Sequence, residues 1–196
     1  MDTPQNARSC AADLYEWFES VAFALTLTLL ILVFGFNFSR VSGTSMVPTL
    51  ADGDRVVVRT AFYTPQRGDI ITTDTWISYG KPLVKRGIGL PGDVVDIDAA
   101  TGRVSVNGSV LDETYISSDT TLAGDVAMPF TVPAGSVFVM GDNRNNSADS
   151  RYAPVGTVEQ SRILGKVLFI LFPGAQTDQY GSVTGGRDFS RIGAVS

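Results

Sequence analysis

The sequence predicts a mainly β fold: a compact, mostly antiparallel β domain carried on a single N-terminal transmembrane helix. Two observations predict it. No residue from Ser20 to Ser39 is charged, and an apolar stretch of this length can cross a bilayer. From residue 51 onward, short runs rich in β-branched residues alternate with Gly, Pro and Asp, a pattern typical of strands and turns. A length of 196 residues fits one such domain and its anchor.

The composition excludes several kinds of site. The chain has no histidine, and its single cysteine, Cys10, precedes the hydrophobic stretch. Ser-His-Asp catalysis, thiol catalysis in the domain and an internal disulfide are therefore excluded, and no zinc or other metal site is expected. A net charge of -5 offers no basic surplus for phosphates, so we expect no nucleic-acid partner.

The first segments are a polar stretch over residues 1–19 and an anchor over residues 20–39. A helix of that length spans roughly 30 Å, the thickness of the hydrocarbon core. A cleaved secretory signal is the alternative, but no basic cluster precedes the stretch and no small-x-small site follows it. Basic residues do not decide the orientation, because Arg8 and Arg40 lie on opposite sides.

The β domain is expected over residues 40–173. Its predicted strands are 55–59, 69–73, 83–88, 93–97, a hairpin over 104–111, 136–140 and 166–171. Asn107-Gly108 favours a type I′ turn at the centre of that hairpin. Residues 112–128 are expected to form a loop. Residues 174–196 are polar and Gly-rich without periodicity, so we expect a flexible C-terminal tail.

Two residues are candidates for chemistry. Ser45 lies in a short turn between Gly43 and Pro48, directly after the anchor, where a hydroxyl can be presented rather than buried. Lys85, one of only three lysines, lies within an apolar strand. Its amine is a base only when neutral, and burial lowers the ordinary pKa of about 10.4 towards that condition. The spacing leaves open whether Lys85 points inward or towards solvent.

A third polar stretch, residues 141–151, permits three interpretations. It resembles an Asx-rich turn, and its oxygen-bearing side chains are compatible with calcium. The calcium interpretation lacks the central Gly and terminal Glu of such loops and places Arg144 in the middle. In the third, the stretch is a polar scaffold in which Asp149 pairs with Arg151 and Ser147 holds the lysine amine.

Taken together, these stretches resemble bacterial type I signal peptidases, the membrane-anchored Ser-Lys proteases that remove signal peptides from exported proteins. The resemblance covers roughly residues 15–173. Four stretches carry it in the family's order: Ser-Met-Val-Pro-Thr-Leu at 45–50, Gly-Asp-Arg-Val at 53–56, Lys-Arg through Pro-Gly-Asp at 85–93, and Gly-Asp-Asn-Arg through Asp-Ser-Arg at 141–151. Each motif is modest, but the ordered set is specific.

The resemblance implies the roles of the site residues. Ser45 is the expected nucleophile, Lys85 the general base, and Ser147 the residue that orients the amine. The expected supports of the site are Asp142, Arg144, Asp149 and Arg151, with Arg86 beside Lys85. Two positions depart from the family: Gly43 stands where some members carry a hydroxyl oxyanion donor, and Gly87 where a larger apolar residue is common.

The resemblance also implies the substrate and its surroundings. We expect an extended peptide to add to a strand edge near Lys81–Val84, with small residues entering shallow apolar pockets. The candidate walls are Val41, Met46, Leu50, Leu83 and Val84, each of which is also suited to ordinary core packing. The expected partners are signal peptides of exported preproteins, the bilayer and a nearby export translocon. No cofactor is implied, and family topology puts the domain on the extracytoplasmic side of the cell membrane.

Three alternatives remain. A related Ser-Lys peptidase with a narrow client, of the conjugation or pilin type, shares these motifs. An inactive membrane-anchored β domain that only binds peptides has no need to retain Ser45, Lys85 and Ser147 together. A self-cleaving repressor uses the same dyad but carries a DNA-binding module where this chain has its hydrophobic stretch.

Overall fold

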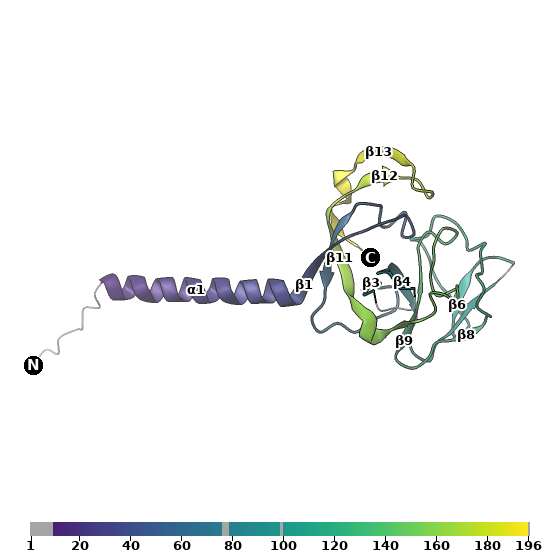
Figure 1. Cartoon of the computed structure of the whole chain (residues 1–196), viewed down its shortest axis with the longest axis horizontal. Coiled ribbons are helices and arrows are strands. Elements are labelled where there is room, and N and C mark those ends of the chain that lie inside the picture. The colour runs from purple at the N-terminus through teal and green to yellow at the C-terminus, as the bar shows by residue number, and fades with distance from the viewer. Residues whose placement is uncertain (1–9, 76–78, 99, 196) are drawn as a thin grey trace, which may run out of the picture.

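The structure is a computed structural model that describes residues 10–75, 79–98 and 100–195. One long helix, α1 (Cys10–Gly35), extends away from a β domain (Figure 1). Its segment Ala12–Gly35 is long and apolar enough to cross a membrane, and none of it is buried by the protein. Exposed leucine and phenylalanine side chains along such a helix are stable only in an apolar environment.

The helix ends at Gly35, four residues before the predicted end of the anchor at residue 39. Residues Phe36–Arg40 form strand β1 instead, and they pair antiparallel with Arg55–Arg59, strand β2. Uncharged residues such as Phe36 and Phe38 suit either a helix or a strand, so pairing with β2 decides the outcome. The hydrophobic stretch therefore leads directly into the sheet, without an intervening linker.

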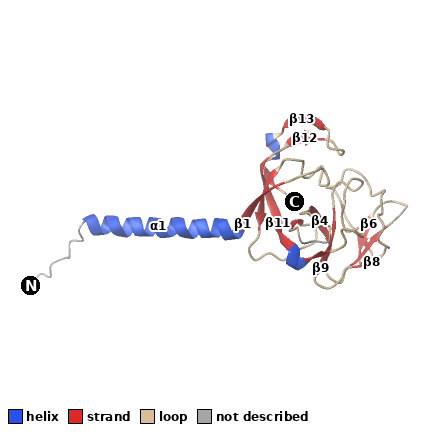
Figure 2. Ribbon diagram, viewed as in Figure 1, coloured by secondary structure: helices blue, strands red, loops and turns tan. Residues whose placement is uncertain are grey.

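The main sheet is antiparallel throughout and curls around the core (Figure 2). Among the described residues its strand order is β1, β2, β11, β3, β4, β9, β10, and β14 also pairs with β11. The bounds not yet given are β11 (Ile163–Phe172), β3 (Ile70–Thr73), β4 (Val84–Gly89), β9 (Ser136–Met140), β10 (Val158–Glu159) and β14 (Gly193–Ala194). A 3-10 turn, η1 (Gln160–Arg162), leads from β10 into β11.

A smaller sheet has the order β7, β6, β5, β8. Its strands are β5 (Val94–Ile97), β6 (Val104–Val106), β7 (Ser109–Val110) and β8 (Phe130–Thr131). Asn107 and Gly108 join β6 to β7 with φ of +53° and +78°. Two successive positive φ angles are what a type I′ turn requires, so the predicted hairpin is confirmed.

Most predicted strands are present close to their expected bounds, and a loop connects β7 to β8 as expected. Strands β8 and β10 were not predicted, because two residues are too few to show an alternating pattern. The fold is mainly β with one N-terminal apolar helix, as the sequence predicts.

The C-terminal residues differ from the expected flexible tail. They form a hairpin, β12 (Ala175–Thr177) with β13 (Val183–Arg187), then a 3-10 turn, η2 (Phe189–Arg191), and β14. Arg191 fastens the segment to the domain, because its guanidinium donates to both carboxylate oxygens of the buried Asp54, at 3.0 and 2.7 Å. Val195 and Phe189 add apolar contacts with the core and with Phe172, but these residues are too few and too irregularly spaced to form a periodic pattern in the sequence.

One hydrophobic cluster lies beneath the segment between β1 and β2. It contains Val41, Met46 and Leu50 from that segment, together with Val56, Val58, Ile70, Val167 and Ile170 from β2, β3 and β11. Each such side chain, fully buried, contributes about 1.5–3 kcal/mol relative to exposure. Met46 is 1% exposed and immediately follows Ser45, so burial of its side chain fixes the position of that serine.

Candidate active site

Ser45 lies in a turn held at several points. Met46 and Leu50 are buried, and the Leu50 N–H donates to the Met46 carbonyl at 2.8 Å. The Ser45 carbonyl accepts from the N–H of Asn143, on the loop after β9, at 3.0 Å. Gly43 has a φ of +90°, and its N–H donates to Asp52 at 2.8 Å. These contacts leave the Ser45 hydroxyl facing the strand that carries Lys85.

Lys85 lies on β4, with its side chain turned inward and only 3% exposed. The inward orientation that the sequence left open is therefore the one adopted. Its Nζ lies 2.5 Å from Ser45 Oγ and donates to the Val84 carbonyl at 3.2 Å. An amine and a hydroxyl at this separation can exchange a proton directly.

The pKa of the Lys85 amine is lowered from 10.5 to about 8. Burial is the largest cause, since an ammonium loses its hydration there, and the charge of Arg151 lowers the pKa further. The carboxylates of Asp149 and Asp142 oppose this shift but do not cancel it. A useful fraction of the amine is therefore neutral near neutral pH, and this neutral form accepts protons.

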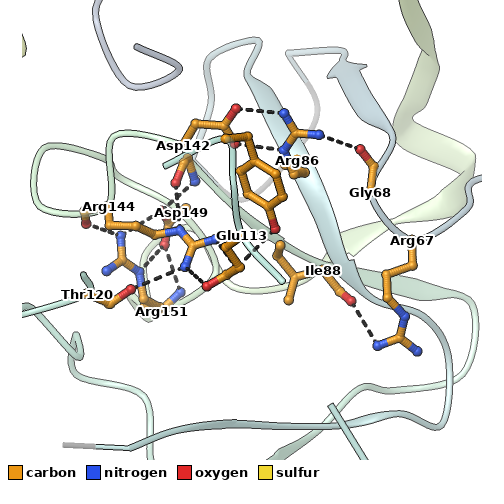
Figure 3. A network of polar contacts seen from close by, with 12 residues as sticks. Arg67, Gly68, Arg86, Ile88, Glu113, Thr120, Asp142, Arg144, Asp149 and Arg151 are labelled. Carbon is orange, nitrogen blue, oxygen red and sulfur yellow. Dashed lines mark hydrogen bonds and ion pairs between the residues drawn. The ribbon is translucent and has the colours of Figure 1, made fainter. Parts of the chain in front are cut away.

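Figure 3 shows three buried arginine–carboxylate pairs, one of which includes the neighbour of Lys85 on β4. Arg86, next to Lys85, binds Asp142 through two hydrogen bonds of 2.8 Å. Arg151 binds Asp149 at 2.8 and 2.9 Å, the ion pair that the sequence predicts. Asp149 also accepts from the N–H of Gly141 at 2.9 Å. The Arg86–Asp142 pair connects β4 with the loop after β9, and the contacts of Asp149 hold that loop together, so both help to set the position of Lys85 relative to Ser45.

The third pair, Arg144 with Glu113, was not predicted. Glu113 lies in the loop between β7 and β8, where no motif or periodicity marks it. Arg144 donates to both of its carboxylate oxygens, and Tyr115 in the same loop lies 3.9 Å from the Arg86 guanidinium. The loop therefore covers the ion pairs from outside and does not line the cleft at Ser45.

No hydrogen bond joins Ser147 to the Lys85 amine in the structure, so its expected role of orienting the amine stays a prediction. Its Oγ is buried and has no hydrogen-bond partner among the described residues. It lies against Gly141, where an added Cβ would be 2.3 Å from Ser147 Oγ and 2.4 Å from the Ser45 carbonyl oxygen. The backbone of Gly141 thus separates Ser147 from the Ser45 turn, and only glycine leaves room for both.

A cleft of about 400 Å³ contains the dyad. Four of the five predicted pocket residues line it: Val41, Met46, Leu83 and Val84. Leu50 does not, because it is fully buried in the core beneath the turn. Strand β9 pairs with β4 only over Arg86–Gly89, so the described part of the chain places no strand beside residues 82–84 on that side. An extended peptide has an open edge there.

The C-terminal hairpin contacts the nucleophile turn, which the sequence did not predict. The Gln179 carbonyl accepts from the side-chain amides of Asn143 and Asn146, at 2.8 and 2.7 Å. The same two amides donate to the carbonyl and the hydroxyl of Thr44, at 3.1 and 3.2 Å. Gln179 thereby braces the residue before the nucleophile through two asparagines.

No group of three or more metal-ligating side chains occurs in residues 10–75, 79–98 or 100–195. The chemistry that the described residues offer is that of a buried amine beside a serine hydroxyl, in an open cleft with a partly apolar lining. Such an arrangement suits acyl transfer to the serine.

Comparison with known proteins identifies the family. The family model described as signal peptidase, peptidase S26, matches residues 14–172. Signal peptidase I of Bacillus licheniformis is 38% identical over 182 residues, 87% of this chain and 95% of that protein. Signal peptidase I T of Bacillus subtilis (strain 168) is 38% identical over 186 residues, 88% and 92% of the two chains.

A crystal structure of a signal peptidase I from Enterococcus faecalis V583 is 34% identical, with a TM-score of 0.46, and the match covers 54% of this chain and 98% of that one. The residues that the family model matches include Ser45, Lys85 and the buried ion pairs near them. The match ends before the C-terminal hairpin. The chain belongs to the signal peptidase family, peptidase S26.

Proposed function

We propose that this membrane-anchored peptidase cleaves signal peptides with Ser45 as nucleophile and Lys85 as general base. The observation that carries the proposal is the 2.5 Å contact between Lys85 Nζ and Ser45 Oγ. It is supported by the burial that lowers the pKa of this amine to about 8. A solvent-exposed lysine would be protonated at neutral pH and would accept no proton.

The reaction proceeds in two acyl transfers. Neutral Lys85 takes the Ser45 proton as Oγ attacks the scissile carbonyl, and the resulting ammonium then protonates the departing amine. Water attacks the acyl-enzyme, with Lys85 again accepting the proton and returning it to Ser45 Oγ. The base is regenerated at the end of the cycle.

The developing oxyanion needs donors near Ser45. The Ser45 N–H is the first, because no acceptor within the described residues engages it. Gly43 supplies no hydroxyl, and its N–H is already bound to Asp52. Once Ser45 Oγ is acylated, it is a weaker hydrogen-bond acceptor for the Lys85 amine. The buried hydroxyl of Ser147 then orients that amine. The paired Asp142, Arg144, Asp149, Arg151 and Arg86 support this geometry.

The substrate is an extended peptide with small residues before the cut. Residues 82–84 offer an open strand edge, and Val41, Met46, Leu83 and Val84 form a shallow apolar lining. Backbone pairing supplies affinity, and the shallow lining admits small side chains at alternate positions, which is the small-x-small pattern.

The helix α1 places the cleft at the membrane surface, where signal peptides leave the bilayer. Strand β1 begins directly after the helix, and the residues that follow it carry Ser45 within a few residues. We propose that the β domain lies on the extracytoplasmic side, close to the export translocon, since cleavage there releases an exported protein.

A cleavage assay in detergent tests the dyad. Wild type, Ser45→Ala, Lys85→Ala and Arg103→Ala, an exposed control outside the cleft, are incubated with a preprotein carrying an Ala-x-Ala site. Products are identified by N-terminal sequencing. We expect wild type and Arg103→Ala to cut after the second alanine, and both dyad variants to lose about 10³-fold or more in rate. The logarithm of kcat/KM should rise with unit slope below pH 8. Equal cutting by Lys85→Ala would refute the dyad.

A further inference from the structure

A second cleft of about 540 Å³ adjoins the catalytic cleft. The two clefts share Arg40, Gly43 and Thr44 in their linings, so the turn that carries Ser45 forms the boundary between them. The C-terminal hairpin, including Tyr180 and Arg187, forms the opposite wall of the second cleft. This hairpin lies outside residues 14–172, which the family model matches.

Three guanidinium groups gather at this second cleft. Arg40 and Arg55 are directly opposite each other in the antiparallel pairing of β1 and β2, so their side chains share one face. Arg187 lies over the ring of Phe172 at 4.7 Å, and Arg55 lies 6.0 Å from the same ring. Like charges placed directly opposite are unfavourable unless a counter-charge joins them.

Within the described residues none of these three guanidinium groups has a directly paired carboxylate. No carboxylate there forms an ion pair within 4.0 Å of Arg40, Arg55 or Arg187. Asp52 also lines the cleft and accepts from the Gly43 N–H, and its carboxylate offsets one of the three positive charges. The lining of the second cleft therefore keeps a surplus of positive charge in a chain whose net charge is -5, and this surplus favours the binding of an anion.

A peptide can pass from one cleft to the other over Gly43. A Cβ added at this position would meet no atom within 4 Å, so the passage beside the nucleophile turn is open. The apolar edge at Leu83 and Val84 lies only in the catalytic cleft. A peptide whose scissile bond lies over Ser45 therefore has one side on the apolar edge and the other directed at the arginines.

We propose that the second cleft binds the substrate segment that follows the scissile bond and selects an acidic side chain within its first few residues. This inference rests on the proposed function, which assigns the apolar edge to the residues before the bond. Arg40, Arg55 and Arg187 are the specificity residues, and they attract a carboxylate before and during acylation. The selectivity is electrostatic and lies on the leaving-group side.

The position of the cleft favours a peptide over a lipid head group. The strand β1 leaves the membrane helix at Phe36, which pairs with Arg59, whereas Arg40 and Arg55 pair at the opposite end of the two strands. Four residues of strand place these arginines roughly 13 Å farther from the helix. A peptide that leaves the active site reaches them without contact with the bilayer.

The test is a substrate series for the full chain in detergent. Peptides with one Ala-x-Ala site carry Asp, Asn or Lys in turn at each of the first five positions after the cut. For each, kcat/KM is measured with wild type, Arg55→Gln, Arg187→Gln and the control Arg103→Gln, an exposed arginine directly before strand β6. We expect wild type to favour Asp over Asn by roughly fivefold at one or two positions, as exposed charge pairs of this kind allow.

The ratio of kcat/KM for the Asp peptide to that for the Asn peptide should fall towards one in Arg55→Gln and Arg187→Gln. It should persist in Arg103→Gln and decrease at 0.5 M NaCl. A flat series in wild type, or a preference unchanged in the two cleft variants, overturns the inference. Neutral peptides serve as the internal reference: if Ser45 still cleaves them while the series is flat, only this inference fails. Flotation with phosphatidylglycerol and phosphatidylcholine vesicles tests the alternative, in which the arginines bind an anionic lipid head group. Weaker phosphatidylglycerol binding by the cleft variants, without a change in peptide preference, also overturns it.

Discussion

Arg86 and Asp142 join the strand that carries Lys85 to the loop after β9 through two hydrogen bonds of 2.8 Å each. Their side chains are 2% and 0% exposed. Asp142 also accepts from the hydroxyl of Thr49, at 2.5 Å, just beyond the nucleophile turn. One carboxylate thus connects the three segments that build the active site.

Removing this carboxylate is expected to destabilise the protein strongly. Asp142→Asn leaves Arg86 buried without its full counter-charge, a change that typically costs about 3–5 kcal/mol. The measurement is the thermal unfolding midpoint in detergent. Arg162→Gln, which loses only an exposed 3.7 Å pair with Asp74, is the control and should change stability by less than about 1 kcal/mol. Similar midpoints for the two variants would show that the buried pair contributes little.

Lys85→Met is expected to make the inactive enzyme more stable at pH 7. The folded-state pKa of Lys85 is lowered from 10.5 to about 8, so below pH 8 the folded protein must bury an ammonium. Removing it should raise the unfolding free energy by up to about 3 kcal/mol, since each pKa unit corresponds to 1.36 kcal/mol. Between pH 8 and 10.5 only the unfolded chain keeps the proton, so wild-type stability rises with pH and the gap closes.

Unfolding of wild type, Lys85→Met and the exposed control Lys81→Met is followed by denaturant titration at pH 7, 8.5 and 10. The control should track wild type at each pH. A stability difference for Lys85→Met that is constant from pH 7 to 10 would mean that the amine is not titrating in this range in the folded protein.

The sequence predicts most of the strands and the role of Lys85, but not the partners of the buried charged residues. Short β-branched runs identified most strands, because half-buried strands leave a period of two. Periodicity alone did not orient Lys85; the ordered motifs of the family assigned its role. The pairing of Arg86 with Asp142 spans 56 residues, and Glu113 lies in a loop with no motif, so neither pairing follows from spacing.

Two other outcomes depend on tertiary packing. Leu50 is apolar and close to Ser45 in sequence, features shared by a pocket wall and a core residue, and its burial under the turn decides between them. The C-terminal hairpin contains few apolar residues and is fastened by charge and backbone bonds, which leave no periodic pattern.

The contact of the Gln179 carbonyl with Asn143 and Asn146 predicts that Asp178, far from Ser45 in sequence, affects catalysis. Its carboxylate accepts from the N–H groups of Tyr180 and Ser182, and so shapes the turn that presents the Gln179 carbonyl. Asp178→Ala should lower kcat by roughly three- to tenfold with little change in KM, because the turn around Ser45 loses alignment. Steady-state kinetics and a melting curve measure both effects.

Asp188→Ala is the matched control, since Asp188 caps the nearby turn η2 in the same way, through Ser190. It should leave kcat near the wild-type value. The double variant Asp178→Ala with Asn146→Ala should lose less than the product of the two single losses, because both act through Gln179. Equal losses for Asp178→Ala and Asp188→Ala would point to general loosening of the segment.

Two glycines near the site differ in the room that they leave for a side chain. At Gly87 an added Cβ would lie 3.4 Å from the Gln66 carbonyl oxygen and 3.6 Å from Val137, close to ordinary contact. Gly87→Ala should keep activity within about twofold and stabilise by about 0.5 kcal/mol. At Gly141 the added atom would overlap the Ser45 carbonyl, so Gly141→Ala should abolish cleavage. Comparable activities of the purified, folded variants would contradict this distinction.

The carbonyl that braces the nucleophile turn belongs to residue 179, and the arginine that fastens this segment is residue 191. The helix α1, by contrast, lies within the first 35 residues. During synthesis the anchor therefore leaves the ribosome long before the residues that hold Thr44 in place. A nascent chain can be inserted in the membrane and carry both Ser45 and Lys85, yet it acquires the brace only after residues 179–191 have also been synthesised.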